Sequence, residues 1–455
     1  MDADTAAALT RAADAAARRH VGIVLGLVDA RSGETGVAGR GSAGRPDGRP
    51  VGASTLFEIG SVTKTVTALL LADAVVRDEV QLDTPLRAVV PVGVRVPSRD
   101  GVDITLEDLA THRSGLPHSP LGWAPVLRSG LLTHENPYAG ITVPGLYDAL
   151  ERARLRRTPG TGRPRYSNFA MAVLGQALTD HLGSPDYASL VRARVCEPLG
   201  LRDTVVLPDA EQEERLARGH GRRDRPVEPW YLSGLAGAGA LRSTADDLLA
   251  YLRAQLRPDS TLLAEALVLA QRERHRSRLA GGMALGWSRW SGPSGPLLFH
   301  GGATGGFRTF TAFAPESALG VVALSNSTRA PDRAALGLLR DLTRAGSARS
   351  GRPPSGRTRP EPTRPSASAP PSPGARAARP AADRPLSPWW WSCTARRPCR
   401  RWSTPPPGGP GRRSPTAAGC RRADTTPSTR AGGRRRRARG PGATRRGGAP
   451  RGLPR

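Results

Sequence analysis

Short apolar runs stand at both ends of the first 344 residues and predict β-strands there. Residues 21–30 form a continuous apolar run that ends in Arg31-Ser32-Gly33, which is typical of a buried strand followed by a hairpin turn. Near the other end, residues 307–313 alternate between two faces and a second apolar run covers 319–324. We therefore predict that both ends contribute strands to one sheet.

Helical patterns occupy the positions between these strands. Residues 4–19 form an alanine-rich amphipathic segment, and residues 61–76 are apolar on almost every face, which predicts a buried central helix. Residues 82–256 show helices and long loops with little strand alternation. Within them, Thr105 and Thr244 each precede a run with acidic residues in its first turn, so their hydroxyls are predicted to cap two helices.

This order of elements predicts an α+β fold rather than alternating βαβ units. We expect an antiparallel sheet formed by both termini of the body, residues 1–344, flanked by helices and carrying an inserted all-helical region. The sheet part covers about 1–80 and 257–344, and the helical insertion covers about 81–256. The remaining residues, 345–455, form an Arg/Pro/Gly-rich tail.

The charge of the chain is concentrated in this tail. The chain of 455 residues has a formal charge of +28, but residues 345–455 contain 26 Arg and 3 acidic residues and so contribute +23 of it, which leaves +5 for the body. The tail also has two Leu and no Ile, Val, Phe or Met. So few apolar side chains cannot offset the entropy lost on ordering, so we predict that the tail is disordered.

Three readings of the tail remain open. Its Arg434–Arg437 run and its Trp389–Trp391 run could hold nucleic acid or anionic lipid through charge and stacking. It could also be a solvated linker, or an out-of-frame reading of GC-rich DNA. The abrupt loss of Ile, Val, Phe and acidic residues favours the last reading, so we do not expect nucleic acid as a partner.

Nothing in the composition indicates a membrane or a disulfide framework. No stretch reaches the roughly 18 uncharged apolar residues that a membrane span needs. The first 20 residues lack the basic region and continuous apolar core of a signal peptide, so a cytoplasmic location is expected unless the start codon lies elsewhere and an export signal has been missed. Of four cysteines, Cys196 alone lies in the body.

Lys64 is the sole lysine among 67 basic residues. Unlike arginine, lysine can lose its proton when it is desolvated or placed near other cations. Ser61 stands three residues before it, on the same face of the predicted helix. A serine hydroxyl needs a neighbouring base to become a nucleophile, and a buried lysine can be that base. A solvated helix surface is the alternative, but it fits an otherwise apolar helix poorly.

Two other segments carry candidate chemistry. Tyr166-Ser167-Asn168 follows a Gly/Pro loop and precedes an apolar helix, a suitable place for a catalytic phenol and a substrate-binding amide. His300-Gly301-Gly302-Ala303 precedes a predicted strand, and its glycines allow a ligand to approach the backbone. Taken alone, each segment fits a structural role better than a catalytic one. In the first, Tyr166 would pack in the interior and Asn168 would cap the helix. In the second, residues 300–303 would form a glycine hairpin that contains a histidine without a function.

Taken together and in this order, the three segments resemble the penicillin-recognising serine hydrolases. This superfamily comprises class C β-lactamases, DD-peptidases and related esterases, and the resemblance rests on residues 57–64, Tyr166-Ser167-Asn168 and His300-Gly301-Gly302. Residues 104–117 and 237–248 strengthen it, and it spans about residues 4–344. His300 replaces the lysine of the third motif, which is more similar to the DD-peptidase, D-aminopeptidase and esterase branches.

The resemblance implies a role for each motif position. Ser61 would be the acylated nucleophile, Lys64 its base, and Tyr166 the group that passes a proton to the leaving group. Asn168 would bind the substrate's amide, and the strand His300-Gly301-Gly302-Ala303 would line the substrate, with His300 near its carboxylate or leaving group. The N–H groups of Ser61 and Ala303 would form the oxyanion hole.

The resemblance thus predicts a serine acyl hydrolase without metal or cofactor. Its substrate would be a small ester or amide, a D-amino-acid peptide among them, and a class C β-lactamase acting on β-lactams is the alternative within the superfamily. A non-catalytic ligand-binding domain and tail-driven nucleic-acid binding are the alternatives outside it. His112 and His118 lack a carboxylate or thiol at ligand spacing, so we expect a solvated loop there and no metal.

Overall fold

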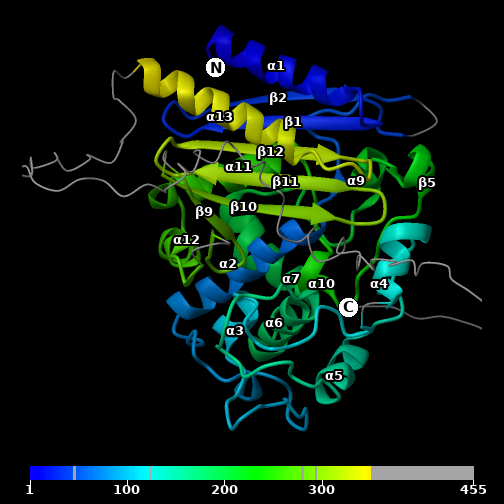
Figure 1. Ribbon diagram of the computed structural model, residues 1–455, viewed down its shortest axis with the longest axis vertical. Coiled ribbons are helices and arrows are strands. Elements are labelled where there is room, and N and C mark those ends of the chain that lie inside the picture. Colours follow the sequence, from blue (N-terminus) through cyan, green and yellow to red (C-terminus); the bar gives the residue numbers. More distant parts are fainter. Residues whose placement is uncertain (45–47, 123, 278–280, 293–294, 350–455) are drawn as a thin grey trace, which may run out of the picture. The chain divides into compact units, whose positions relative to one another are not determined.

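An antiparallel sheet of eight strands forms the centre of the structure, a computed structural model that describes residues 1–44, 48–122, 124–277, 281–292 and 295–349. The strand order is β2-β1-β12-β11-β10-β9-β8-β7, so strands from the two ends of the body are neighbours (Figure 1). The predicted sheet from both termini is confirmed. The strands are β1 Gly22–Asp29, β2 Glu34–Gly41, β7 His275–Ser277, β8 Gly281–Met283, β9 Ser288–Gly292, β10 Gly295–Ala303, β11 Arg308–Ala314 and β12 Leu319–Ser325.

Strand β1 is apolar up to its last residue, Asp29, because helices cover both faces of the sheet. Its Ile23 and Leu25 pack in one hydrophobic cluster with helices α1 (Ala3–Ala17) and α13 (Asp332–Arg349), which lie together over one face in Figure 1. Its Val24 belongs to the cluster on the other face, where α11 (Ala245–Leu256) packs against β1 and β12. Side chains that alternate between two apolar layers give an unbroken apolar run in the sequence.

The predicted central helix is α2, Thr63–Val76, and its residues from Thr63 to Ala74 are buried. It begins two residues later than the pattern predicted, because Ser61 lies in a preceding 3-10 turn, η1 (Gly60–Val62). The chain must turn sharply there after strand β3 (Phe57–Glu58), and Gly60 makes the turn with φ +50°. A glycine adopts this left-handed conformation without steric cost.

The segment 81–256 consists of helices joined by long loops, and its two predicted caps are confirmed. Thr105 and Asp108 form a capping box, and the Thr244 hydroxyl accepts from the Asp247 amide at 3.2 Å. Two-residue strands also occur there: β6 (Arg242–Ser243) pairs with β3, and β4 (Gly219–His220) pairs with β5 (Pro226–Val227). The other helices are α3 Leu106–Ala110, α4 Ala124–Arg128, α5 Val143–Glu151, α6 Asn168–His181, α7 Tyr187–Val191, α8 Glu197–Leu199, α9 Ala210–Arg215, α10 Ala236–Gly239 and α12 Ala264–Gln271.

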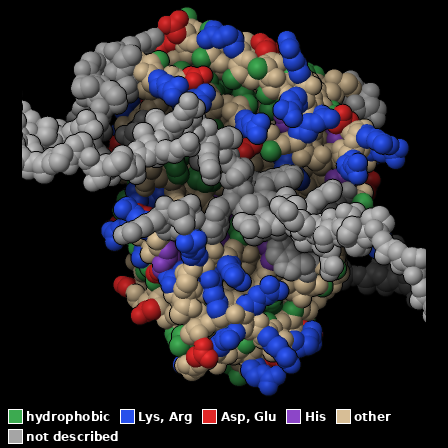
Figure 2. All heavy atoms as spheres, in the orientation of Figure 1, with side chains coloured by type: hydrophobic (Ala, Val, Ile, Leu, Met, Phe, Trp, Pro, Cys, Tyr) green, Lys and Arg blue, Asp and Glu red, His purple; other side chains and the backbone are tan. Residues whose placement is uncertain are grey.

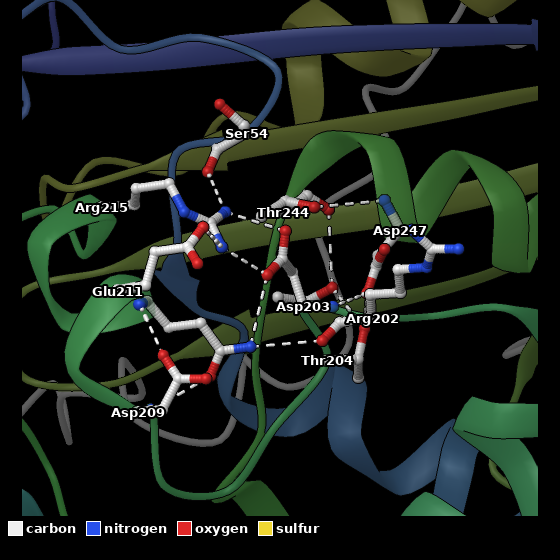
Figure 3. Close-up of polar contacts among 11 residues, drawn as sticks. Ser54, Arg202, Asp203, Thr204, Asp209, Glu211, Arg215, Thr244 and Asp247 are labelled. Atoms are coloured by element: carbon white, nitrogen blue, oxygen red, sulfur yellow. Dashed lines mark hydrogen bonds and ion pairs between the residues drawn. The ribbon is translucent and has the colours of Figure 1, made fainter.

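A network of hydrogen bonds and ion pairs connects Ser54, which precedes β3, with helices α9 and α11 (Figure 3). Arg215 contacts Asp203 at 2.6 Å and donates to the Ser54 carbonyl at 3.0 Å. The Asp203 amide and the Thr204 hydroxyl both donate to Asp247 at 2.8 Å. These contacts hold the chain that leads into β3 and the turn carrying Ser61.

Helix α13 runs five residues past the predicted body boundary at residue 344. The rest of the predicted disordered tail, 350–455, lies outside the described residues. In the described ranges, none of the helices is long and apolar enough to cross a membrane.

Candidate active site

Lys64 and Ser61 are in direct contact. The Lys64 Nζ donates to the Ser61 Oγ at 2.8 Å and also to the carbonyl of Ala238 in α10. The Lys64 side chain is fully buried, whereas Ser61 is half-buried. Burial lowers the pKa of Lys64 well below its ordinary value, and no acidic side chain pairs with it in the described part of the chain. A neutral amine next to a serine hydroxyl can accept its proton.

Tyr166 lies over the same two residues. The Lys64 Nζ is 5.0 Å from the centroid of the Tyr166 ring. Burial raises the pKa of Tyr166 and the nearby Ser61 hydroxyl lowers it, with burial the larger effect. The structure therefore brings the three predicted catalytic residues into one cluster, although Ser61 and Tyr166 are 105 positions apart in the chain.

Asn168 is the first residue of α6, two positions beyond Tyr166. Its Nδ2 donates to the Tyr138 hydroxyl at 3.2 Å. The N-cap of α6 is Ser167, whose hydroxyl accepts from the Ala170 amide at 2.9 Å, so the reading in which Asn168 caps the helix is wrong. The Asn168 amide is left half-buried beside Tyr166.

The end of strand β10 borders the turn that carries Ser61. A Cβ on Gly302 would lie 2.0 Å from the Ile59 carbonyl, and one on Gly60 would lie 2.7 Å from the Ala303 amide nitrogen. The two backbones can approach this closely only because both positions are glycine. This contact places the amide of Ala303 next to the turn of Ser61.

His300 stands earlier on β10 and completes the cluster, with its ring centroid 6.2 Å from that of Tyr166. Its Nδ1 is 2.9 Å from the Gly301 carbonyl, and Gly301 itself is buried. Burial, followed by the charge of Lys64, lowers the pKa of His300 to about 3, so the ring is neutral at physiological pH. All the sequence-predicted site residues thus lie on three segments that meet at Ser61.

The prediction of a solvated loop at His112 and His118 is wrong. His112 is 3% exposed, and its ring centroid is 4.7 Å from that of Tyr166, while His118 approaches the same ring at 5.8 Å. In the sequence, both look like isolated polar residues in a turn. His112 lies within residues 104–117, a stretch that carries the resemblance, and His118 follows it directly; this is the one signal that could have linked them to the site.

Residues 112–118 hold the Tyr166 segment by its backbone. The backbone N–H of Arg165 donates to the His112 carbonyl at 2.8 Å, and that of Asn168 donates to the His118 carbonyl at 2.9 Å. The backbone N–H of Ser167 donates to His112 Nδ1 at 3.3 Å, and the Ser167 hydroxyl donates to the Pro117 carbonyl at 2.7 Å. Because Nδ1 accepts a hydrogen bond, the neutral His112 ring carries its proton on Nε2.

The hydrogen bond that His112 Nδ1 accepts from the Ser167 backbone N–H should affect the rate of acylation. His112 has φ +59°, which asparagine tolerates, and an asparagine oxygen can replace Nδ1 as the acceptor for Ser167. We expect His112→Asn to retain most of the acylation rate and the nearly isosteric His112→Leu to lose about 100-fold, because Tyr166 shifts. Pre-steady-state hydrolysis of a nitrophenyl ester measures this rate, and equal rates in two folded variants would contradict the expectation.

Comparison with known proteins agrees with this geometry. A family model described as Beta-lactamase matches residues 8–345. The chain belongs to the Beta-lactamase family. It is 28% identical over 292 residues to the D-alanyl-D-alanine-carboxypeptidase/endopeptidase AmpH of Escherichia coli K12, which covers 61% of this chain and 72% of AmpH. It is 33% identical over 285 residues to Esterase EstB of Burkholderia gladioli, which covers 56% of this chain and 70% of the esterase.

A solved class C β-lactamase has the same fold. The class C β-lactamase from Rhodobacter sphaeroides superposes with a TM-score of 0.62 at 27% identity, over 74% of this chain and 99% of that chain. The chain is therefore a serine hydrolase of this family, and the predicted class of serine acyl hydrolase is confirmed.

Proposed function

We propose that residues 1–344 hydrolyse small esters or amides through an acyl-enzyme on Ser61. The observation that carries the proposal is the 2.8 Å contact between Ser61 Oγ and the fully buried amine of Lys64. Burial lowers the pKa of Lys64, and a lowered pKa is what allows a lysine to act as a general base.

In the acylation step, Lys64 takes the Ser61 proton while Oγ attacks the substrate carbonyl carbon. The carbonyl oxygen becomes an oxyanion, which the N–H groups of Ser61 and Ala303 would stabilise. The intermediate then collapses, the bond to the leaving group breaks, and the proton passes through Tyr166 to the departing oxygen or nitrogen. A water molecule attacks the acyl-enzyme by the same route, releasing the acid and restoring the Ser61 hydroxyl.

The remaining site residues would select the substrate. Asn168 would bind the amide of the acyl group, and His300, Gly301 and Gly302 would line the leaving-group side. The similarity to AmpH and EstB supports D-amino-acid peptides and esters as substrate classes. The 27% identity to a class C β-lactamase supports β-lactam hydrolysis as the second candidate.

Intact-mass spectrometry of the full chain treated with a fluorophosphonate tests the proposal. We expect a single adduct on the wild-type protein and none on Ser61→Ala. A folded wild-type protein without an adduct would favour a non-catalytic ligand-binding domain, and an adduct that survives Ser61→Ala would place the nucleophile on another serine. Nitrophenyl esters, D-alanyl peptides and a chromogenic cephalosporin then distinguish the substrate classes by kcat/KM.

A further inference from the structure

The segment that delivers Tyr166 to the site is rich in arginine. Residues 152–165 contain six arginines and no acidic residue. The segment is hydrogen-bonded along the loop that holds Tyr166: the Arg156 amide donates to the Gly115 carbonyl at 2.9 Å, and the Arg165 amide donates to the His112 carbonyl at 2.8 Å. The backbone positions of these arginines are therefore fixed beside the candidate active site.

Arg152 pairs with Asp148 at 4.0 Å, but three other arginines of this segment have no such partner in the part of the chain that the structure describes. Arg156, Arg163 and Arg165 are exposed, and in the described ranges their guanidinium groups form no ion pair with an acidic residue. Figure 2 shows Lys and Arg side chains over both the sheet half and the helical half of the visible face. We name Arg156, Arg163 and Arg165 the arginine rim.

The lowered pKa values of Arg157 and His118 reflect the same excess of positive charge. The pKa of Arg157 is lowered, first by burial and then by the charges of Arg165 and Arg113. The pKa of His118 is also lowered, first by burial, with contributions from Lys64 and Arg156. Of the carboxylates near the segment 152–165, Asp108 is buried in the capping box of α3, Asp100 accepts from the Thr158 hydroxyl, and Asp148 pairs with Arg152 at 4.0 Å. A substrate at the site therefore meets a field that favours anions.

We propose that the arginine rim selects acyl donors whose acyl group carries a negative charge, such as a carboxylate. This inference rests on the proposed function and adds the substrate class. The rim lies on the side of the site formed by residues 112–118 and Tyr166, not on strand β10, which carries His300. Charges of one sign beside a site raise the local concentration of an oppositely charged substrate and its rate of association.

A pair of nitrophenyl esters that differ in one charge tests the proposal. The mono-4-nitrophenyl ester of adipic acid is the anionic substrate, and its methyl-capped counterpart is the neutral one. We expect the full-length triple variant Arg156→Gln/Arg163→Gln/Arg165→Gln to lose about tenfold in kcat/KM for the anionic ester at low salt, mainly through KM. The neutral ester should change less than about twofold, and high salt should remove the difference because it screens exposed charges.

The matched control removes three exposed arginines on the far face of the sheet, Arg11 in α1, Arg18 at its C-cap and Arg333 in α13: Arg11→Gln/Arg18→Gln/Arg333→Gln. It changes the net charge equally and should leave both esters unaffected. An equal loss for both esters in the rim variant, or an equal loss of the anionic ester in the control, would overturn the proposal. If wild-type protein hydrolyses neither ester and forms no Ser61 adduct, the proposed function itself has failed.

Discussion

Replacing Lys64 with arginine is expected to lower the rate of acylation of Ser61 by about 10²–10⁴-fold, the contribution typical of a general base. The variant keeps a long basic side chain, but a guanidinium cannot be deprotonated in a protein and so cannot accept the Ser61 proton. The burst of nitrophenol in stopped flow and the rate of fluorophosphonate labelling both measure this step. Acylation at near-normal rate would exclude Lys64 as the base.

Lys64→Met serves as the control for folding. An arginine in a fully buried site can disturb the packing, whereas methionine matches the lysine stem without charge. We expect Lys64→Met to fold, to lose acylation equally, and to exceed the wild-type protein in stability at neutral pH, because burying the amine favours its uncharged form. A variant that acylates at the wild-type rate would contradict the assignment.

The lowered pKa of Lys64 also sets two pH dependences. Acylation by the wild-type protein should decline as the pH falls through this lowered pKa, because the amine becomes protonated. Between the lowered pKa and the ordinary value of 10.5, the unfolded state binds the proton and the folded state does not, so this group's contribution to stability rises with pH. The stability gap between Lys64→Met and the wild-type protein should therefore narrow toward high pH.

Replacing Arg242 with methionine is expected to lower the free energy of unfolding by about 3–5 kcal/mol, a large part of the stability of a typical domain. Arg242 on β6 and Glu58 on β3 form a buried ion pair at 3.6 Å, with side chains 1% and 4% exposed. The Trp230 amide also donates to Glu58 at 2.7 Å. Without Arg242, the Glu58 carboxylate is left buried and uncompensated. Urea denaturation at pH 7.5 measures the loss.

The pH dependence of Arg242→Met separates this cause from lost packing. Burial raises the pKa of Glu58, and the charge of Arg242 opposes that rise, so removing the arginine raises the pKa further. The folded variant then holds a proton that the unfolded chain has released, and its stability should recover as the pH falls. A loss that is constant between pH 5 and pH 8 would contradict an electrostatic origin.

An exposed ion pair provides the matched control. Arg87 contacts Asp103 at 2.7 Å, but the two side chains are 63% and 35% exposed. Arg87→Met removes the same chemical groups from a solvated pair and should cost less than about 1 kcal/mol. The difference between the two variants measures the effect of burial on a pair of the same chemical type.

The elements of the fold follow from patterns that can be read locally. Strand β1, helix α2 and the caps Thr105 and Thr244 depend on residues within a few positions of each other, and all occur as predicted apart from shifts at their ends. Ser61 lies in a 3-10 turn rather than in the helix. Local periodicity does not show where the chain must turn out of strand β3.

The sequence alone also predicts that the side chains of Ser61 and Lys64 lie next to each other. Three residues of separation place the two side chains on one face, and the unusual choice of lysine in an arginine-rich chain marks the position. Tyr166 and His300 were joined to them by resemblance, because no spacing along the chain relates residues so far apart. Their ring contacts depend on how α6 and β10 pack around α2.

Thus the sequence by itself determined the order of the elements, the adjacent pair Ser61 and Lys64, and the family to which the chain belongs. Tertiary structure alone decided that His112 is a buried support for Tyr166, that Glu58 and Arg242 form a buried pair, and that three arginines border the site. The physical reason is that burial and electrostatic environment arise from long-range packing. A residue type and its immediate neighbours do not specify which distant groups surround it.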